Sequence, residues 1–412
     1  MIDTLLSARS RLIPIATLAL AGLGLAAATF VDTRVALTRD TAPDAALALS
    51  PNDSDALALK SDLLLAKAAE GLGIAEASRA ARLAVAARPI NARALRTLGI
   101  LAQARGKDVE DDRYLALAAR ASRRDLGVQL WQIERAVAAN NVPAVLQNYD
   151  VALRTNAASA PLLFPILTVA LDDPEIRREF APYIRKNPPW LAASLDYAVV
   201  NSKNPAAILS AISAAGRLPN GSPFRDIENR LIGHLAGARQ YHAARNLYLR
   251  LHGADAAVPQ TVRFTGAATD ARFRPMTWQV MNDAGVGSEF ASNGGGDASL
   301  RMVAETGQSG LVAQKLLYLA PGMYHLSWQQ AAEVTNAGAN IAIDVSCLEG
   351  HAGTIAWQQQ IPVQSGIRQL AIDMIIPRVC SVQMISIRMF GGRGETGVDT
   401  TLSGFVLQRT PD

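Results

Sequence analysis

Amide, imidazole and guanidinium side chains recur at alternate positions in three short segments of the C-terminal third of the chain. Alternate residues of a β-strand point to the same face, so each segment is expected to present a polar face. Such groups hydrogen-bond sugar hydroxyls or a peptide backbone, and they equally suit a face wetted by solvent. We predict that one ligand-binding face carries these residues: His325, Gln329, Gln358, Gln360 and Arg388.

Two tryptophans in the same segments offer an alternative binding surface, because an indole ring can stack on a sugar ring. Trp328 shares its strand face with Tyr324 and Leu326, and Trp357 alternates with Ile355 and Ile361. These are core patterns. We therefore predict that both tryptophans are buried and that the polar residues between them face outward.

The chain has two cysteines, Cys347 and Cys380, and neither lies at a spacing typical of metal ligands. The alternatives are a structural disulfide or two buried thiols. We expect the disulfide, which is typical of exported proteins.

No catalytic or cofactor-binding pattern emerges. Gly392, Gly394 and Gly397 form a GxGxxG, but it stands between predicted strands with no helix to receive a phosphate. None of the five histidines pairs at a metal-ligand spacing. The net charge is +4 in 412 residues, without a run of basic residues. We predict no cofactor, no metal, no enzymatic activity and no nucleic-acid partner.

The segments that carry these residues read as strands separated by Gly-, Asn- and Asp-rich turns, which predicts an antiparallel β-sandwich or jelly roll over 261–410. Ten strands are predicted: 261–266, 277–282, 299–304, 311–320, 322–329, 340–347, 354–361, 368–376, 381–390 and 402–408. The segment LAPGMYHLSW (319–328) resembles a recurring piece of carbohydrate-binding and galactose-binding-like jelly rolls. That resemblance implies carbohydrate binding.

From 44 to 253 the chain is rich in Ala and Leu with apolar residues at helical spacing, and 254–260 reads as a linker. Two segments beginning at Pro51 and Pro89 align as helical hairpins. The second resembles a tetratricopeptide repeat at Leu95, Leu98, Gly99, Leu115 and Ala118. The resemblance implies an α-α superhelix of five or six hairpins whose groove binds a protein partner; the alternative is a stiff spacer. Candidate groove residues are Arg93, Arg96, Gln129, Gln132 and Arg135.

Residues 12–31 hold no charge, and 20 helical residues span about 30 Å, the thickness of a bilayer core. We predict a single-pass signal-anchor in a bacterial inner membrane, with residues 1–11 cytoplasmic and the bulk of the chain periplasmic. A cleaved secretory signal is an alternative, because Ala26 and Ala28 form an A-x-A pattern. A buried helix is another.

Together these features predict a multidomain α plus β protein: a transmembrane helix, a helical superhelix and a C-terminal antiparallel sandwich. This architecture resembles that of anchored repeat proteins of bacterial envelopes that accompany exopolysaccharide assembly and export. The resemblance implies a non-enzymatic scaffold whose repeats bind a protein and whose sandwich binds a polysaccharide or a second protein. The alternatives are a secreted glycan hydrolase or lyase built on the jelly roll, and a purely structural spacer.

Overall fold

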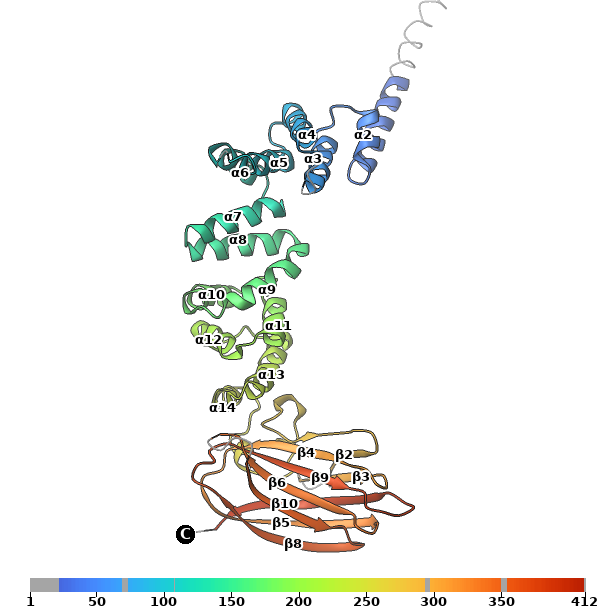
Figure 1. The fold of residues 1–412 in the computed structure, drawn as a ribbon, viewed down its shortest axis with the longest axis vertical. Coiled ribbons are helices and arrows are strands. Elements are labelled where there is room, and N and C mark those ends of the chain that lie inside the picture. The colour runs from blue at the N-terminus through green and yellow to red at the C-terminus, as the bar shows by residue number, and fades with distance from the viewer. Residues whose placement is uncertain (1–21, 69–72, 107, 293–296, 350–353, 411–412) are drawn as a thin grey trace, which may run out of the picture. The chain divides into compact units, whose positions relative to one another are not determined.

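The computed structural model describes residues 22–410 except 69–72, 107, 293–296 and 350–353. The chain forms two compact units, Met1–Leu163 and Phe164–Asp412. The first is helical, and the second combines helices with two β-sheets (Figure 1).

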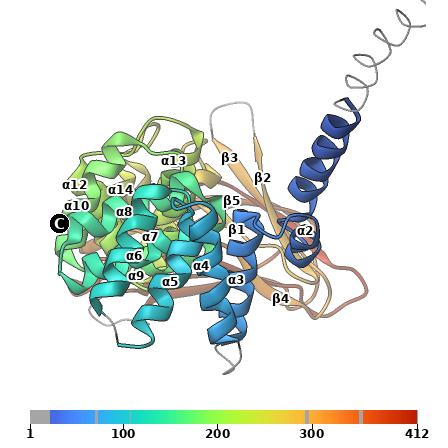
Figure 2. The same ribbon diagram turned by 90° about the horizontal axis from the view of Figure 1, so that it is seen from above.

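The first unit consists of helices that pack as successive pairs, with the members of a pair side by side (Figure 1, Figure 2). Asparagine and aspartate side chains begin several of them: Asn91 Oδ1 accepts a hydrogen bond from Ala94 N at 3.1 Å, and Asp125 Oδ1 accepts one from Val128 N at 3.0 Å. After a helical segment at 22–38, the helices are α2 (Pro43–Leu49), α3 (Ser54–Ala68), α4 (Ile74–Ala87), α5 (Ala92–Gln103), α6 (Asp108–Ala121), α7 (Leu126–Ala138) and α8 (Val142–Thr155).

Helices α5 and α6 approach each other closely at Gly99. A Cβ atom at Gly99 of α5 would lie 2.4 Å from Cγ of Leu115 in α6, so only glycine fits at this contact. Leu95 and Ala118 are buried beside it. The helices therefore meet where the repeat pattern places its small residues, whereas membership of the tetratricopeptide family stays a prediction.

The predicted membrane anchor lies only partly within the described residues. Its residues 12–21 are outside them, and residues 22–31 are helical. Large apolar side chains there are exposed, among them Leu23, Leu25 and Phe30 at 69%, 71% and 66%. Within the described part of the chain, no helix combines the length and the apolar character needed to cross a bilayer.

The second unit begins with helices that pack against one another, and the last of them contacts the sandwich. They are α9 (Ala160–Ala170, which starts in the first unit), α10 (Pro174–Lys186), α11 (Leu191–Asn201), α12 (Pro205–Ala215), α13 (Ser222–Gly237) and α14 (Tyr241–Tyr248). Short 3-10 turns occur in this unit at η2 (Val258–Gln260) and η3 (Ala271–Phe273), and in the first unit at η1 (Ala157–Ser159).

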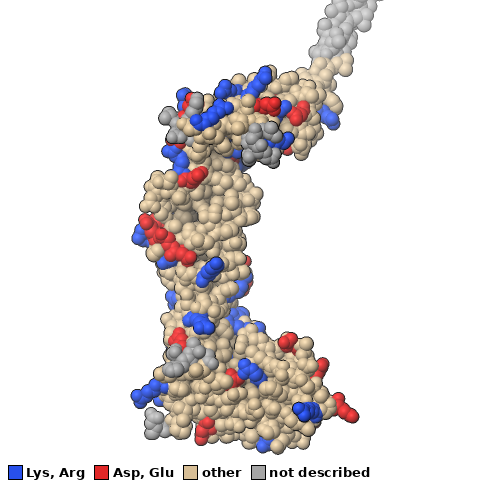
Figure 3. Space-filling model, in the orientation of Figure 1, with Lys and Arg blue, Asp and Glu red and all other residues tan. Residues whose placement is uncertain are grey.

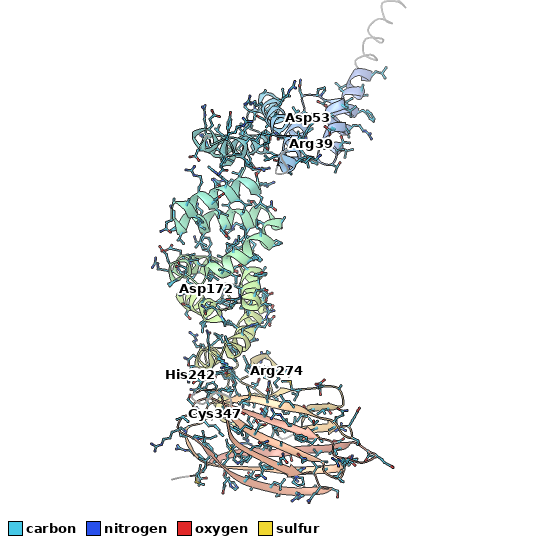
Figure 4. All side chains as sticks on the ribbon, in the orientation of Figure 1. Arg39, Asp53, Asp172, His242, Arg274 and Cys347 are labelled. Atoms are coloured by element: carbon cyan, nitrogen blue, oxygen red, sulfur yellow. A yellow bond between two sulfur atoms is a disulfide. The ribbon has the colours of Figure 1, made fainter. Side chains whose placement is uncertain are left out.

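Helix α14 is joined to the sandwich by polar contacts. The Tyr318 hydroxyl donates to Tyr241 O at 2.6 Å, and the His242 Nε2 to Glu349 Oε2 distance is 2.9 Å. The Arg245 guanidinium lies 5.1 Å from the centre of the Tyr318 ring. Figure 4 labels His242 and Cys347 in this part of the second unit.

The prediction of an antiparallel β-sandwich is confirmed. A first sheet has the order β1-β4-β9-β6-β7 and a second sheet the order β2-β3-β10-β5-β8. The described strands are β1 (Gln279–Val280), β2 (Val286–Ser292), β3 (Ala298–Ala304), β4 (Ser309–Leu317), β5 (Gly322–Val334), β6 (Asn340–Cys347), β7 (Ile355–Pro362), β8 (Gly366–Ile376), β9 (Gln383–Phe390) and β10 (Val398–Arg409).

Two strand assignments differ from the prediction. Residues 261–266 alternate like a strand, but they form only one bridge, at Thr265. Instead, Phe264 packs into the core, stacked on Phe405 with ring centres 5.1 Å apart. Strand β2 was missed because its sequence, VGSEFAS, and the glycines that follow it read as a turn.

The disulfide prediction is confirmed. Cys347 at the end of β6 is bonded to Cys380, with Cα atoms 5.3 Å apart. The bond ties β6 to the segment that leads into β9. Since the two strands are also neighbours in the first sheet, it reinforces a contact that the sheet already makes.

Candidate functional site

The five predicted ligand-binding residues do not share one face, so that part of the prediction is wrong. His325 and Gln329 lie on β5 in the second sheet, whereas Gln358, Gln360 and Arg388 lie on β7 and β9 in the first. Alternation within a strand identifies its outer face but not the sheet to which the strand belongs. On the second sheet, His325 Nδ1 lies 2.7 Å from Asp373 Oδ1.

The outer face of the first sheet carries a line of polar side chains, one from each of its five strands. Residue by residue, the register aligns the members across the sheet. This polar row consists of Gln279, Gln314, Ser386, Asp344 and Gln358. With neighbouring strands about 4.8 Å apart, the row is about 19 Å long.

Flanking residues show that the polar row faces away from the core. Ile343 and Ile385, which precede Asp344 and Ser386, are fully buried on the other face. Within the row, Gln314 Nε2 donates to Gln279 Oε1 at 3.3 Å. Asp344 and Ser386 are themselves only 3% and 5% exposed, so the middle of the row is largely covered.

Gln360 and Arg388 stand beside the polar row on either side of Ala342, with which both are in register. Arg388 forms an ion pair with Asp344, whose side chain is 4% exposed, while the side chain of Arg388 is 45% exposed. Ser346 Oγ also donates to Asp344 Oδ2, at 3.3 Å. The carboxylate therefore fixes the guanidinium in place and leaves part of it open to solvent.

The prediction that both tryptophans are buried is confirmed for Trp328 but not for Trp357, whose neighbour Ile355 on the same strand face is 56% exposed. Trp328 is 1% exposed, together with buried Tyr324 and Leu326, which confirms its place in the core. Trp357 is half-buried and in register with buried Val345, so it belongs to the inner face. The half-buried Phe390, two residues beyond Arg388 on the same face of β9, is the aromatic ring that adjoins the polar face.

The polar row and its two flanking residues can therefore form many hydrogen bonds. The carboxylate of the row, Asp344, is already paired with Arg388. Sequence reasoning found Gln358, Gln360 and Arg388 but missed the rest of the row, because Gln279, Gln314 and Ser386 are isolated polar residues in apolar segments. Asp344 could have been recognised from the sequence as a site residue, since a carboxylate in an apolar strand requires a partner.

A separate hollow of about 820 Å³ lies on the first unit, among α6, α7 and α8. Predicted groove residues Gln129, Gln132 and Arg135 line it together with Trp131. Gln129 is 3% exposed, and its Oε1 has no hydrogen-bond partner among the described residues. Arg135 pairs with Asp112 and lies 5.2 Å from the centre of the Trp131 ring.

The other two predicted groove residues are engaged in ion pairs. Arg93 and Arg96 reach Asp62 at 3.7 Å and 2.6 Å, and Arg96 also reaches Asp125 at 2.9 Å. These contacts join α5 to α3 and to the start of α7. They serve the packing of the helices.

No protein-family model matches the chain. No curated protein matches it either. Several solved carbohydrate-binding modules are similar to part of it. TmCBM61 in complex with β-1,4-galactotriose is 16% identical, with 36% of this chain and 99% of that chain covered and a TM-score of 0.24. The CBM22-1 xylan-binding domain from Paenibacillus barcinonensis Xyn10C is 12% identical, with 37% and 94% covered and a TM-score of 0.25.

A third, a carbohydrate-binding module from Cellvibrio mixtus lichenase 5A in complex with cellotriose, is 13% identical, with 37% and 99% covered and a TM-score of 0.21. Likenesses of this size do not assign a ligand to this chain.

Proposed function

We propose that the sandwich binds glycan through the outer face of the first sheet and that the protein is a non-enzymatic scaffold. The observation that carries this proposal is the polar row, with Gln360 and Arg388 beside it. Amides and hydroxyls both donate and accept hydrogen bonds, as sugar hydroxyls do. Because the strand register fixes their spacing, little ordering is needed on binding.

Affinity for a single chain is expected to be low, since the face is shallow and ordered water can mediate many of its contacts. Clustering of chains on one surface would raise the apparent affinity through effective concentration. This behaviour suits a protein that holds a polymer with many identical repeats.

The direct test is the double variant Gln358→Ala with Gln360→Ala. Both side chains are exposed on the edge strand β7, so their loss should not unfold the sandwich. Removing hydrogen bonds worth about 0.5–1.5 kcal/mol each lowers glycan affinity by about 5- to 150-fold. The measurement is calorimetric titration of the full chain with oligosaccharides.

The matched control is Gln369→Ala, an exposed glutamine on β8 of the second sheet. It should bind like the wild type. Equal losses in both variants, or no glycan binding by the wild type, would rule out this face as the site.

The alternative of a glycan hydrolase fits this face less well. Glycosidases place two carboxyl groups about 5–9.5 Å apart across the scissile bond. The polar row has one carboxylate, Asp344, which is nearly buried and paired with Arg388. That pairing favours binding over hydrolysis.

A second role, binding of a protein partner by the first unit, is supported by the hollow that contains Gln129. A buried amide oxygen without a partner is costly unless a ligand satisfies it. A photo-crosslinking residue at Gln132 should then trap one defined partner in cells, and Trp131→Ala should abolish the crosslink. Crosslinking that is unaffected by Trp131→Ala would argue for the spacer alternative.

We place the chain in the bacterial inner membrane, with 12–31 as the anchor and the remainder in the periplasm. The uncharged 20-residue segment and the disulfide support this placement. A role in exopolysaccharide assembly or export would bring both proposed ligands together.

A further inference from the structure

Two cavities of the second unit meet at Arg274. The smaller, about 380 Å³, is lined by Gln279 and Gln314 at one end of the polar row, by apolar residues including Met384, and by Arg274. The larger, about 860 Å³, lies between α13 and the η3 region. Both are lined by Arg274, Gly233 and Gly237, so the two cavities adjoin, and the smaller one reaches the end of the polar row. We call the two cavities together the trough.

The guanidinium of Arg274 forms no ion pair with the described residues. Its Nε is buried and has no hydrogen-bond acceptor, and among the described residues no carboxylate pairs with it. Other arginines of the larger cavity are paired: Arg230 with Asp196, and Arg272 with Asp270. A buried N–H group without an acceptor is destabilising, so the structure leaves a site for one.

The backbone holds Arg274 between helix and sheet. Leu316 N of β4 donates to Pro275 O at 2.9 Å, next to Arg274. On the other side, a Cβ atom at Gly233 of α13 would lie 3.9 Å from Arg274 O. A Cβ atom at Gly237 would meet nothing within 4 Å, which leaves that part of the trough open. Figure 4 shows Arg274 where the chain passes from the helices to the strands.

The charge around Arg274 favours an anion. Lys203 lines the larger cavity and, within the described residues, has no ion-pair partner; Asp226 is the carboxylate that lines the same cavity. Figure 3 shows both charge signs spread over the face in view, so the selectivity would come from this local arrangement. A guanidinium presents two parallel N–H groups that match a carboxylate.

We propose that the glycan is acidic and that one of its uronic-acid carboxylates binds Arg274 while neighbouring sugar hydroxyls bind the polar row. This inference rests on the proposed function and names its ligand class. The carboxylate accepts hydrogen bonds from Arg274, Lys203 adds a positive charge farther along the trough, and Gln279 and Gln314 connect the two parts of the site.

The test uses the full chain in detergent and two matched probes: oligogalacturonate and the same oligosaccharide after reduction of its carboxyl groups. Hydrogen bonds to charged groups are worth about 1.5–3 kcal/mol, so the wild type should bind the acidic form about 10- to 150-fold more tightly. Arg274→Gln should bind both forms equally. Arg217→Gln, which removes the same charge from an exposed loop of the same unit, should keep the preference.

The outcomes separate the two proposals. Equal binding of both probes by the wild type overturns the acidic ligand and leaves glycan binding intact. No binding of either probe overturns both. If Arg217→Gln also loses the preference for the acidic probe, that preference comes from net charge and not from Arg274. Tighter binding of dextran sulfate than of oligogalacturonate would refute the assignment to a carboxylate.

Discussion

Lys315 should make the stability of the sandwich depend on pH. It lies in β4, is fully buried, and donates from Nζ to Val258 O at 2.6 Å and to Thr261 O at 2.7 Å. Burial disfavours the charged ammonium and lowers the pKa of Lys315 to about 7, although nearby Asp255 opposes this effect. The segment 258–261, which leads into the sandwich, is therefore held by a group that titrates near neutrality.

The sign follows from proton linkage. The unfolded chain keeps this proton up to the ordinary lysine pKa of 10.5, whereas the folded chain releases it above about 7. Between these values the unfolded state binds more protons, so the free energy of unfolding rises with pH, and it is lowest below neutrality. Integration from about pH 7 to about pH 9 gives about 2 kcal/mol. Above that range tyrosine ionisation adds its own effect, since burial raises the pKa of Tyr318.

Hydrogen exchange of β4 amides, measured by mass spectrometry on the full chain, reports the local opening free energy without assuming two-state unfolding. The control is Lys315→Met, which keeps an unbranched chain without the charge. It leaves two carbonyls without their donor and so should be less stable throughout, but its opening free energy should not change with pH. If wild type and Lys315→Met have the same slope, Lys315 is not the titrating group.

Three further predictions concern an ion pair, the disulfide and the membrane anchor. Arg388→Ala should lower the free energy of unfolding by about 1–3 kcal/mol in urea titrations, because it leaves the buried Asp344 carboxylate unpaired, and Arg388→Met with Asp344→Leu should restore most of it. Reduction of the Cys347–Cys380 bond, which closes a loop of 33 residues, should destabilise the sandwich by about 3–4 kcal/mol in the same assay; an unchanged midpoint would contradict this. If 12–31 is an uncleaved anchor, the protein should stay in membranes after carbonate extraction, and a shortened, extractable form would refute it.

Local pattern predicted most strands and the buried side of β5, because alternation is a property of single segments, whereas on the predicted core face of β7 Ile355 is exposed. Trp328 is the clearest example, since its burial follows from its neighbours Tyr324 and Leu326 alone. Residues 261–266 show the limit of this reasoning. The same alternation occurs there in an irregular segment, which inserts Phe264 into the core beside Phe405. The local sequence of such a segment does not differ from that of a strand.

The candidate site could be predicted only in part, because it depends on pairing between distant segments. Gln279 and Gln358 are at opposite ends of the polar row and belong to strands that do not touch. Their alignment follows from four successive strand registers, each set by the packing of the whole sandwich. For the same reason His325 and Arg388, which alternate alike within their strands, are on different sheets.

Under the proposed function, the Asp344–Arg388 pair contributes more to binding than to folding. A buried ion pair is often no more stabilising than apolar residues of the same size, so stability alone gives little reason for a carboxylate beside Ile343 and Val345 in an apolar strand. The carboxylate does fix the position of a guanidinium. Asp344 holds Arg388 by the ion pair, and the Arg388 side chain is still 45% exposed. A donor whose orientation is set before the ligand arrives loses less entropy on binding. Arg388, which is paired, and Arg274, which has no ion pair with the described residues, would then contribute differently: Arg388 would orient sugar hydroxyls, and Arg274 would select for negative charge.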